Sequence, residues 1–129
     1  MATTMFGSVD NPDIYAEVLT KHNVEFKIHV DGAFGGFIYP ISNKKSTINF
    51  ENPNVSSITI DAHKMLQAPY GTGVFLCRKN LIENVLTKEA QYVNGMDLTI
   101  VGSRSGANAI AVWMILFSYG YYGWFEKIN

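Results

Sequence analysis

The chain has 129 residues, of which 47% are hydrophobic and 16% charged, which is typical of a globular domain with one core. Its formal charge of -1 excludes a strongly basic nucleic-acid surface and a polybasic membrane patch. The single cysteine, Cys77, excludes a disulfide framework and favours a reducing compartment. No signal-peptide pattern and no apolar stretch of the ~18 residues that span a bilayer is found, so the cytoplasm is the expected location.

The first expected element is a helix. Asn11 followed by Pro12 is a typical helix start, with a capping side chain before a proline at the first helical position. Behind it, Ile14 and Val18 recur at helical spacing. The pattern predicts a helix over residues 11–22.

Two strands are expected next. Apolar residues alternate with polar ones over 24–30, which predicts a strand that runs into the glycine-rich segment 31–36. Residues 42–55 are rich in Asn, Ser and Lys and indicate a surface loop. A second strand over 57–60 then leads directly into a His-Lys pair.

The remaining elements are a strand over 74–77, a short helix over 81–87 and a helix over 105–119. The last helix is apolar nearly all round, so it is expected to be buried in protein. Short strands that alternate with helices predict an α/β fold, with a mainly parallel sheet and flanking helices. Ligands of such sheets gather at the carboxyl ends of the strands, where Asp31 and Lys64 both lie.

On spacing alone, a turn-forming aspartate and a solvated surface lysine would look the same as a functional pair. Four segments of the chain, in the expected order, resemble motifs of a known family. Residues 29–36 are similar to the H-V-D-A-A-x-x-G segment of the group II decarboxylases that depend on pyridoxal 5′-phosphate (PLP), and residues 57–64 to their S-x-x-x-[DN]-x-H-K segment. Residues 3–10 resemble their T-T-x-x-G-x-x-D run, and residues 102–106 their G-S-R-x-G segment.

The resemblance covers nearly the whole chain and implies the aspartate-aminotransferase-like fold, fold type I. It implies that Lys64 forms a Schiff base with the aldehyde of PLP. Asp31 matches the carboxylate that keeps the pyridine nitrogen protonated, so that the ring can absorb the negative charge left by departing carbon dioxide. Ala33 matches the small residue that packs against one ring face, and His63 matches a histidine near the phosphate.

Three further residues are candidates by the same resemblance. Thr4 and Thr72 would donate hydroxyl hydrogen bonds near the cofactor, Thr72 in the site of a neighbouring subunit, although Thr4 could also bond within its own turn. Arg104 would either pair with the substrate carboxylate or hold its loop through an internal ion pair. His29 is expected to point away from the site and to be structural. No metal ion is expected.

The sequence also departs from the family pattern. Gly32 stands where alanine is usual, which would loosen the turn slightly. Asp61 would repel a phosphate dianion, so it is expected to point elsewhere or to be bridged by a donor. The family enzymes are much longer, so residues 1–129 are expected to be the central to C-terminal part of the PLP-binding large domain. The upstream phosphate-gripping segment and the small domain would be absent, and the isolated chain would be inactive and expose apolar helix faces.

Three functions remain open. The leading one is decarboxylation of an L-amino acid by a homodimeric enzyme. The second is an aldehyde-lyase of the sphingosine-phosphate lyase type, because those enzymes share the D-x-H-K segment and an A-P-x-G turn like residues 68–71. The third is a non-catalytic remnant. The partner is a small amino-acid substrate in the leading case, but which amino acid depends on the shape of the pocket.

Overall fold

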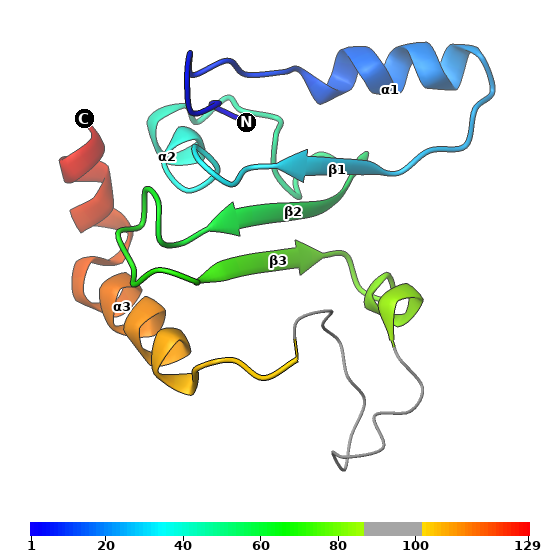
Figure 1. Cartoon of the computed structure of the whole chain (residues 1–129). Coiled ribbons are helices and arrows are strands. Elements are labelled where there is room, and N and C mark those ends of the chain that lie inside the picture. Colours follow the sequence, from blue (N-terminus) through cyan, green and yellow to red (C-terminus); the bar gives the residue numbers. More distant parts are fainter. Residues whose placement is uncertain (87–101) are drawn as a thin grey trace.

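The computed structural model describes residues 1–86 and 102–129 (Figure 1). Within them it contains three strands, three α-helices and one 3-10 helix. In chain order these are α1 (Pro12–Lys21), β1 (Ile28–Asp31), α2 (Tyr39–Ser42), β2 (Val55–Asp61), β3 (Gly73–Cys77), η1 (Ile82–Val85) and α3 (Gly106–Ile128). The expected α/β class with flanking helices is confirmed.

The three strands form one sheet in the order β1-β2-β3. β1 and β2 are parallel, as expected, but β3 runs antiparallel to β2, so the sheet is mixed where a mainly parallel one was predicted. The reason is the connection between Asp61 and Gly73, which is too short to hold a crossover helix. A parallel neighbour needs a crossover of a dozen residues or more, whereas an antiparallel one can follow a tight turn.

Helix α1 begins as the sequence predicts. The Asn11 side-chain oxygen accepts the Asp13 N–H at 2.9 Å, and Pro12 takes the first helical position. The apolar spacing behind it does not mark a buried face, because Ile14 is 59% and Val18 52% exposed. Helical periodicity therefore identified the element correctly, but no element in the described part of the chain covers that side of it.

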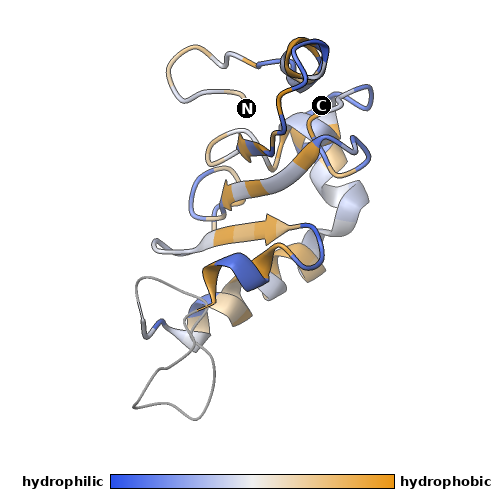
Figure 2. Ribbon diagram, turned by 90° about the vertical axis from the view of Figure 1, so that its right-hand side faces the viewer, coloured by the Kyte–Doolittle hydropathy of each residue, from blue (hydrophilic) through white to orange (hydrophobic). Residues whose placement is uncertain are grey.

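Two hydrophobic clusters form the core. The first lies between β1, β2 and the loop before β2, and its buried members are Met1, Val30, Ile48, Val55 and Ile58. The second lies between the segment after β2 and α3, and its buried members are Ala62, Leu66, Ala68 and Trp124. Figure 2 shows the alternating hydropathy of β2 and the mostly hydrophobic β3. The second cluster lies directly behind the turn that carries Lys64.

Helix α3 is longer and more exposed than predicted. It continues to Ile128 across a kink at Gly120, whose φ of 56° lies in the left-handed region that glycine tolerates best. The prediction of a buried helix is wrong for the described structure, since Trp113 is 60% and Phe117 76% exposed. An all-round apolar surface needs neighbours on every side, and the described elements cover only one side. Neither α3 nor any other helix in residues 1–86 and 102–129 has the length and hydropathy to cross a membrane.

Three smaller differences concern the ends of elements. β1 begins only at Ile28, four residues later than predicted, and the short helix α2 was not expected. The helix expected over 81–87 is the 3-10 turn η1, and position 87 lies outside the described residues. The polar loop before β2 is fastened by Arg78, whose guanidinium donates to the carbonyls of Val55, Phe50 and Asn52 at 2.7–3.0 Å.

Candidate active site

The ends of β1 and β2 bring two predicted motifs to the same edge of the sheet. Asp31 ends β1 and pairs in register with Thr59, and Asp61 ends β2. The pairing continues past the end of β1, because the Gly32 N–H donates to the Thr59 carbonyl at 2.9 Å and the Asp61 N–H to the Ala33 carbonyl at 3.2 Å. The parallel direction of the two strands thus places both carboxylates beside the turn that follows β2.

A cavity of about 370 Å³ lies at this edge. Its lining brings together Lys64, Asp31, Ala33 and Thr4, four of the residues that the sequence singled out. The rest of the lining is Met1, Thr3, Asp10 and Phe34. An amine and a carboxylate from two motifs that lie far apart in the sequence therefore face one cavity, which we call the lysine cavity.

Asp31 also shapes its own turn. One carboxylate oxygen, Oδ1, accepts the Ala33 N–H at 3.0 Å, the bond of an Asx turn. The side chain is exposed, and its turn-forming role exists together with its place in the lysine cavity. The turn bond therefore does not remove the Asp31 side chain from the lysine cavity.

Lys64 is held by Asp61. Its ammonium nitrogen lies 2.9 Å from Asp61 Oδ2, and its backbone N–H donates to the Asp61 carbonyl at 3.0 Å. His63 Nε2 lies 3.9 Å from the same carboxylate oxygen. Of the two arrangements expected for Asp61, the structure shows the one in which a donor bridges it, and the donor is Lys64.

The His63 ring packs against Tyr70, with ring centroids 4.9 Å apart. Its Nδ1 atom is buried and has no hydrogen-bond partner among the described residues. A buried polar atom without a partner is costly, so this nitrogen is suited to a ligand that the structure does not contain.

The structure does not bring the remaining candidates into the lysine cavity. Thr72 is buried, and its hydroxyl donates to the Pro69 carbonyl at 2.8 Å within its own turn. Arg104 is exposed in the segment just before α3. The roles assigned to Thr72 and Arg104 stay predictions.

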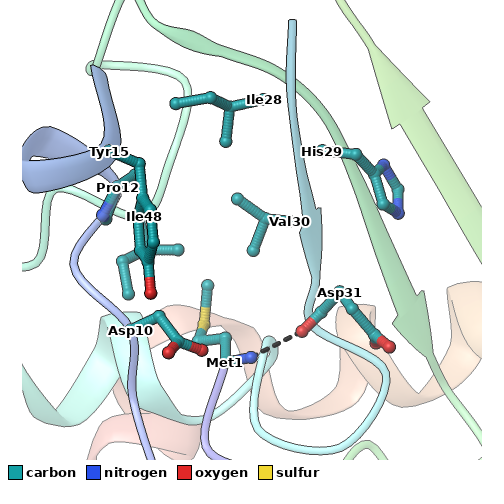
Figure 3. Close-up of a pocket in the computed structure, with 9 residues that line it drawn as sticks. All are labelled: Met1, Asp10, Pro12, Tyr15, Ile28, His29, Val30, Asp31 and Ile48. Atoms are coloured by element: carbon teal, nitrogen blue, oxygen red, sulfur yellow. Dashed lines mark hydrogen bonds between the residues drawn. The ribbon is translucent and has the colours of Figure 1, made fainter. Parts of the chain in front are cut away.

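The expected orientation of His29 is wrong. Residues two apart in a strand share a face, so His29 lies on the same side of β1 as Asp31, while Val30 points the other way (Figure 3). Its ring nitrogens lie 2.8 Å from the Ser57 hydroxyl and 3.2 Å from the Thr59 hydroxyl. These bonds across the sheet are consistent with the structural role predicted for it.

A second cavity of about 380 Å³ adjoins the first, and Figure 3 shows the residues that line it. The two share Met1, Asp10 and Asp31, and the Met1 amino group donates to the Asp31 carbonyl. The second cavity is lined mainly by apolar side chains of α1, β1 and the loop before β2 and contains no lysine. The lysine cavity differs from this one in that a lysine side chain lies beside the Asp31 carboxylate.

The glycine-rich turn after β1 is closely packed, not loosened as Gly32 led us to expect. The Gly36 N–H donates to the Gly32 carbonyl at 2.8 Å. A Cβ atom at Gly36 would lie 2.5 Å from that carbonyl oxygen, and one at Gly32 would lie 2.9 Å from the Thr59 carbonyl oxygen. The turn that carries Asp31 and Ala33 thus requires residues without a side chain at positions 32 and 36.

We expect Gly36→Ala to lower the free energy of unfolding by about 1–3 kcal/mol, because the obstructing atoms are backbone and cannot swing aside. The matched control is Gly106→Ala at the start of α3, where nothing lies within 4 Å of an added Cβ atom. Urea unfolding followed by circular dichroism measures both variants. Equal midpoints for the two would contradict the packing argument.

Sequence reasoning missed the contribution of two carboxylates. Asp10 lines the lysine cavity, and Asp61 pairs with Lys64. Both lie inside motifs that the resemblance had singled out, but no role was assigned to Asp10, and the donor that would bridge Asp61 was not identified. Their spacing along the chain could not show which side chains they meet. The described residues contain no group of three or more His, Cys, Asp or Glu side chains arranged to hold a metal ion.

Comparisons with known proteins point to one family. The model of the family described as "Pyridoxal-dependent decarboxylase conserved domain" matches residues 1–129. The chain is 69% identical to a tryptophan decarboxylase of Clostridium sporogenes over 100% of its own length and 31% of that protein. It is 38% identical to a probable L-tyrosine/L-aspartate decarboxylase of Methanocella arvoryzae, over 98% of the chain and 33% of that protein.

Solved structures give the same fold. A sphingosine-1-phosphate lyase of Burkholderia pseudomallei superposes with a TM-score of 0.82 and 25% identity, covering 98% of this chain and 30% of the other. A glutamate decarboxylase of Lactobacillus brevis superposes with a TM-score of 0.79 and 26% identity, covering 93% of this chain and 29% of the other.

The chain belongs to the pyridoxal-dependent decarboxylase family. Among its curated relatives, the tryptophan decarboxylase of Clostridium sporogenes shares more than two thirds of the residues of this chain. The chain spans about a third of the length of the curated relatives that it matches.

The residues of the lysine cavity fit the cofactor of that family. A primary amine, a carboxylate and a small side chain line one space, and a buried histidine nitrogen without a partner lies in the adjoining turn. These are the groups needed to hold an aldehyde, a ring nitrogen and a flat ring face.

Proposed function

We propose that these 129 residues are part of a PLP-dependent carboxy-lyase that acts on an L-amino acid. The observation that carries the proposal is that the Lys64 amine and the Asp31 carboxylate line one cavity. Had the two side chains lain on opposite faces of the sheet, one pyridine ring could not have met both. Family membership supports the reaction type.

Each residue of the site would have a distinct task. Lys64 would hold the cofactor through its amine, and Asp31 would accept a hydrogen bond from the ring nitrogen and keep the proton there. Ala33 would leave room for the flat ring, His63 would face the phosphate, and the Thr4 hydroxyl would donate to the cofactor. When bound, the cofactor supplies an electron-accepting ring that takes up the charge left by departing carbon dioxide.

We propose an aromatic amino acid as the substrate, with L-tryptophan the first to be tested. The support is the 69% identity with the tryptophan decarboxylase of Clostridium sporogenes, which holds over the whole chain. Substrate choice depends on the shape of the pocket, and much of the relatives' sequence lies outside the matched third.

Membership of the family also supports a proposal for the place of these residues in the whole protein, for its assembly and for its location. Residues 1–129 would form the central to C-terminal part of the large domain, with the phosphate-gripping segment and the small domain supplied by further sequence. Alone, the 129 residues would be inactive. The whole protein would be a homodimer in the cytoplasm, and light scattering of the whole protein measures that assembly.

The test is turnover by the whole protein that contains this chain. With PLP and L-tryptophan, we expect release of carbon dioxide and of the matching amine in equal amounts. Borohydride reduction and peptide mapping should then find a pyridoxyl group on Lys64. Absence of that group in the whole protein would leave only a non-catalytic remnant.

The aldehyde-lyase alternative is supported by the superposition with the sphingosine-1-phosphate lyase and by the segment 61–64. The same assay separates the two reactions. A phosphorylated amino alcohol that yields an aldehyde, with no carbon dioxide from any amino acid, would favour the lyase.

A further inference from the structure

The carboxylate of Asp61 is in contact with the reactive lysine of the proposed site. Its Oδ2 atom lies 2.9 Å from Lys64 Nζ and 3.9 Å from His63 Nε2. Asp10 and Asp31 also line the lysine cavity, but the ion pair of Lys64 within the described residues is with Asp61. One oxygen thus lies beside two residues that the sequence had assigned to the cofactor.

The backbone holds Asp61 in this place. Its N–H donates to the Ala33 carbonyl at 3.2 Å, which ties it to the end of β1, and its carbonyl accepts the Lys64 N–H at 3.0 Å. Its side chain is 21% exposed, so the carboxylate is partly shielded from water. An ion pair between anchored, half-buried groups is screened less by solvent than a pair at the surface.

Lys64 is held and accessible at the same time. Its side chain is 34% exposed, and it lines the lysine cavity while its nitrogen is paired with Asp61. An amine attacks a carbonyl carbon only as the neutral base. The Lys64 nitrogen donates to the Asp61 carboxylate at 2.9 Å and must leave that contact before it can attack, so the contact opposes attack for as long as it lasts.

We propose that Asp61 is a positioning residue that binds the Lys64 ammonium group and holds its nitrogen in place while no cofactor is attached. The relevance of this role to the cofactor rests on the proposed function, whereas the contact between Asp61 and Lys64 is seen in the structure. Removal of the negative charge therefore makes the Lys64 amine more reactive toward any electrophile that reaches the cavity.

The experiment measures amine reactivity in the whole protein that contains this chain, freed of cofactor. Limiting acetic anhydride is added at a fixed pH, and peptide mass spectrometry gives the acetylation rate of Lys64 relative to the exposed Lys79. We expect Asp61→Asn to raise this ratio about two- to fivefold, the range of a partly exposed ion pair. Asp10→Asn, which removes a charge from the same cavity without breaking the ion pair, should leave the ratio nearly unchanged.

A second measurement on the wild-type chain guards against unfolding of the variant. Raising the salt concentration from about 0.05 M to 1 M weakens a partly exposed ion pair, so the Lys64 ratio should rise in the wild type. An unchanged ratio in a folded Asp61→Asn chain, or in the wild type across the salt series, would overturn the proposal. Because no cofactor is present, a failure of PLP attachment would overturn the proposed function and leave this result untouched.

Discussion

Lys64→Ala should abolish covalent attachment of PLP and lower decarboxylation by the whole protein on the order of 10³-fold or more. The alanine has no amine with which to hold the aldehyde, and the lysine cavity has no second lysine in its lining. Borohydride reduction with peptide mapping measures attachment, and release of carbon dioxide measures turnover.

The control for this variant is Lys79→Ala, which removes an amine from an exposed position just after β3. It should attach PLP and turn over as the wild type does. A pyridoxyl group found in equal amount on another lysine of the Lys64→Ala protein would contradict the assignment of Lys64.

Asp31→Asn should lower the rate of decarboxylation by about 10²–10³-fold, the range for losing one preorganised electrostatic contact in a site. Asparagine keeps the oxygen that accepts the Ala33 N–H, so the turn after β1 should survive and only the charge be lost. The measurements are the turnover number and the fraction of protein that carries PLP, with unfolding by urea as a check on the fold.

Glu17→Gln serves as the matched control, because it removes a carboxylate from an exposed position on α1, away from the lysine cavity. A loss of stability in Asp31→Asn as large as its loss of activity would show that the carboxylate supports the turn and not the ring nitrogen. Turnover within a few-fold of the wild type would remove Asp31 from the mechanism.

Much of the fold could be predicted because local chemistry decides it. The Asn11 cap and Pro12 place the start of α1, alternating apolar residues identify β2, and a continuous apolar run identifies β3. The direction of a strand within the sheet could not be predicted in this way, because it depends on the path of the chain between Asp61 and Gly73. Strand propensity is the same for either direction, so the antiparallel β3 was not foreseen.

The candidate site could be predicted in part. Motifs at the carboxyl ends of strands identified Asp31 and Lys64, and the lysine cavity brings them together. The Asp61 contact could not be found in this way, because which carboxylate meets an amine depends on the path of the turn between them. His29 was placed wrongly because the period of a strand is two, so residues 29 and 31 share a face.

Exposure was the property least open to prediction. An apolar helix indicates burial only when its neighbours are present, and α3 leaves Trp113 and Phe117 uncovered in the described structure. The same holds for Ile14 and Val18 on α1. The hydrophobic pattern of a segment therefore indicates how much of it is buried when all its neighbouring elements are present. The described part of the chain contains only some of those neighbours.

The packing of Trp124 behind the turn after β2 has a consequence for the order of folding. Leu66 and Ala68 lie against a residue that comes more than fifty positions later in the chain. Contacts so distant in sequence form late, because a long loop must close first. During synthesis the reactive lysine would therefore leave the ribosome on an unsupported segment, and it would reach its final place only when the last helical turns dock.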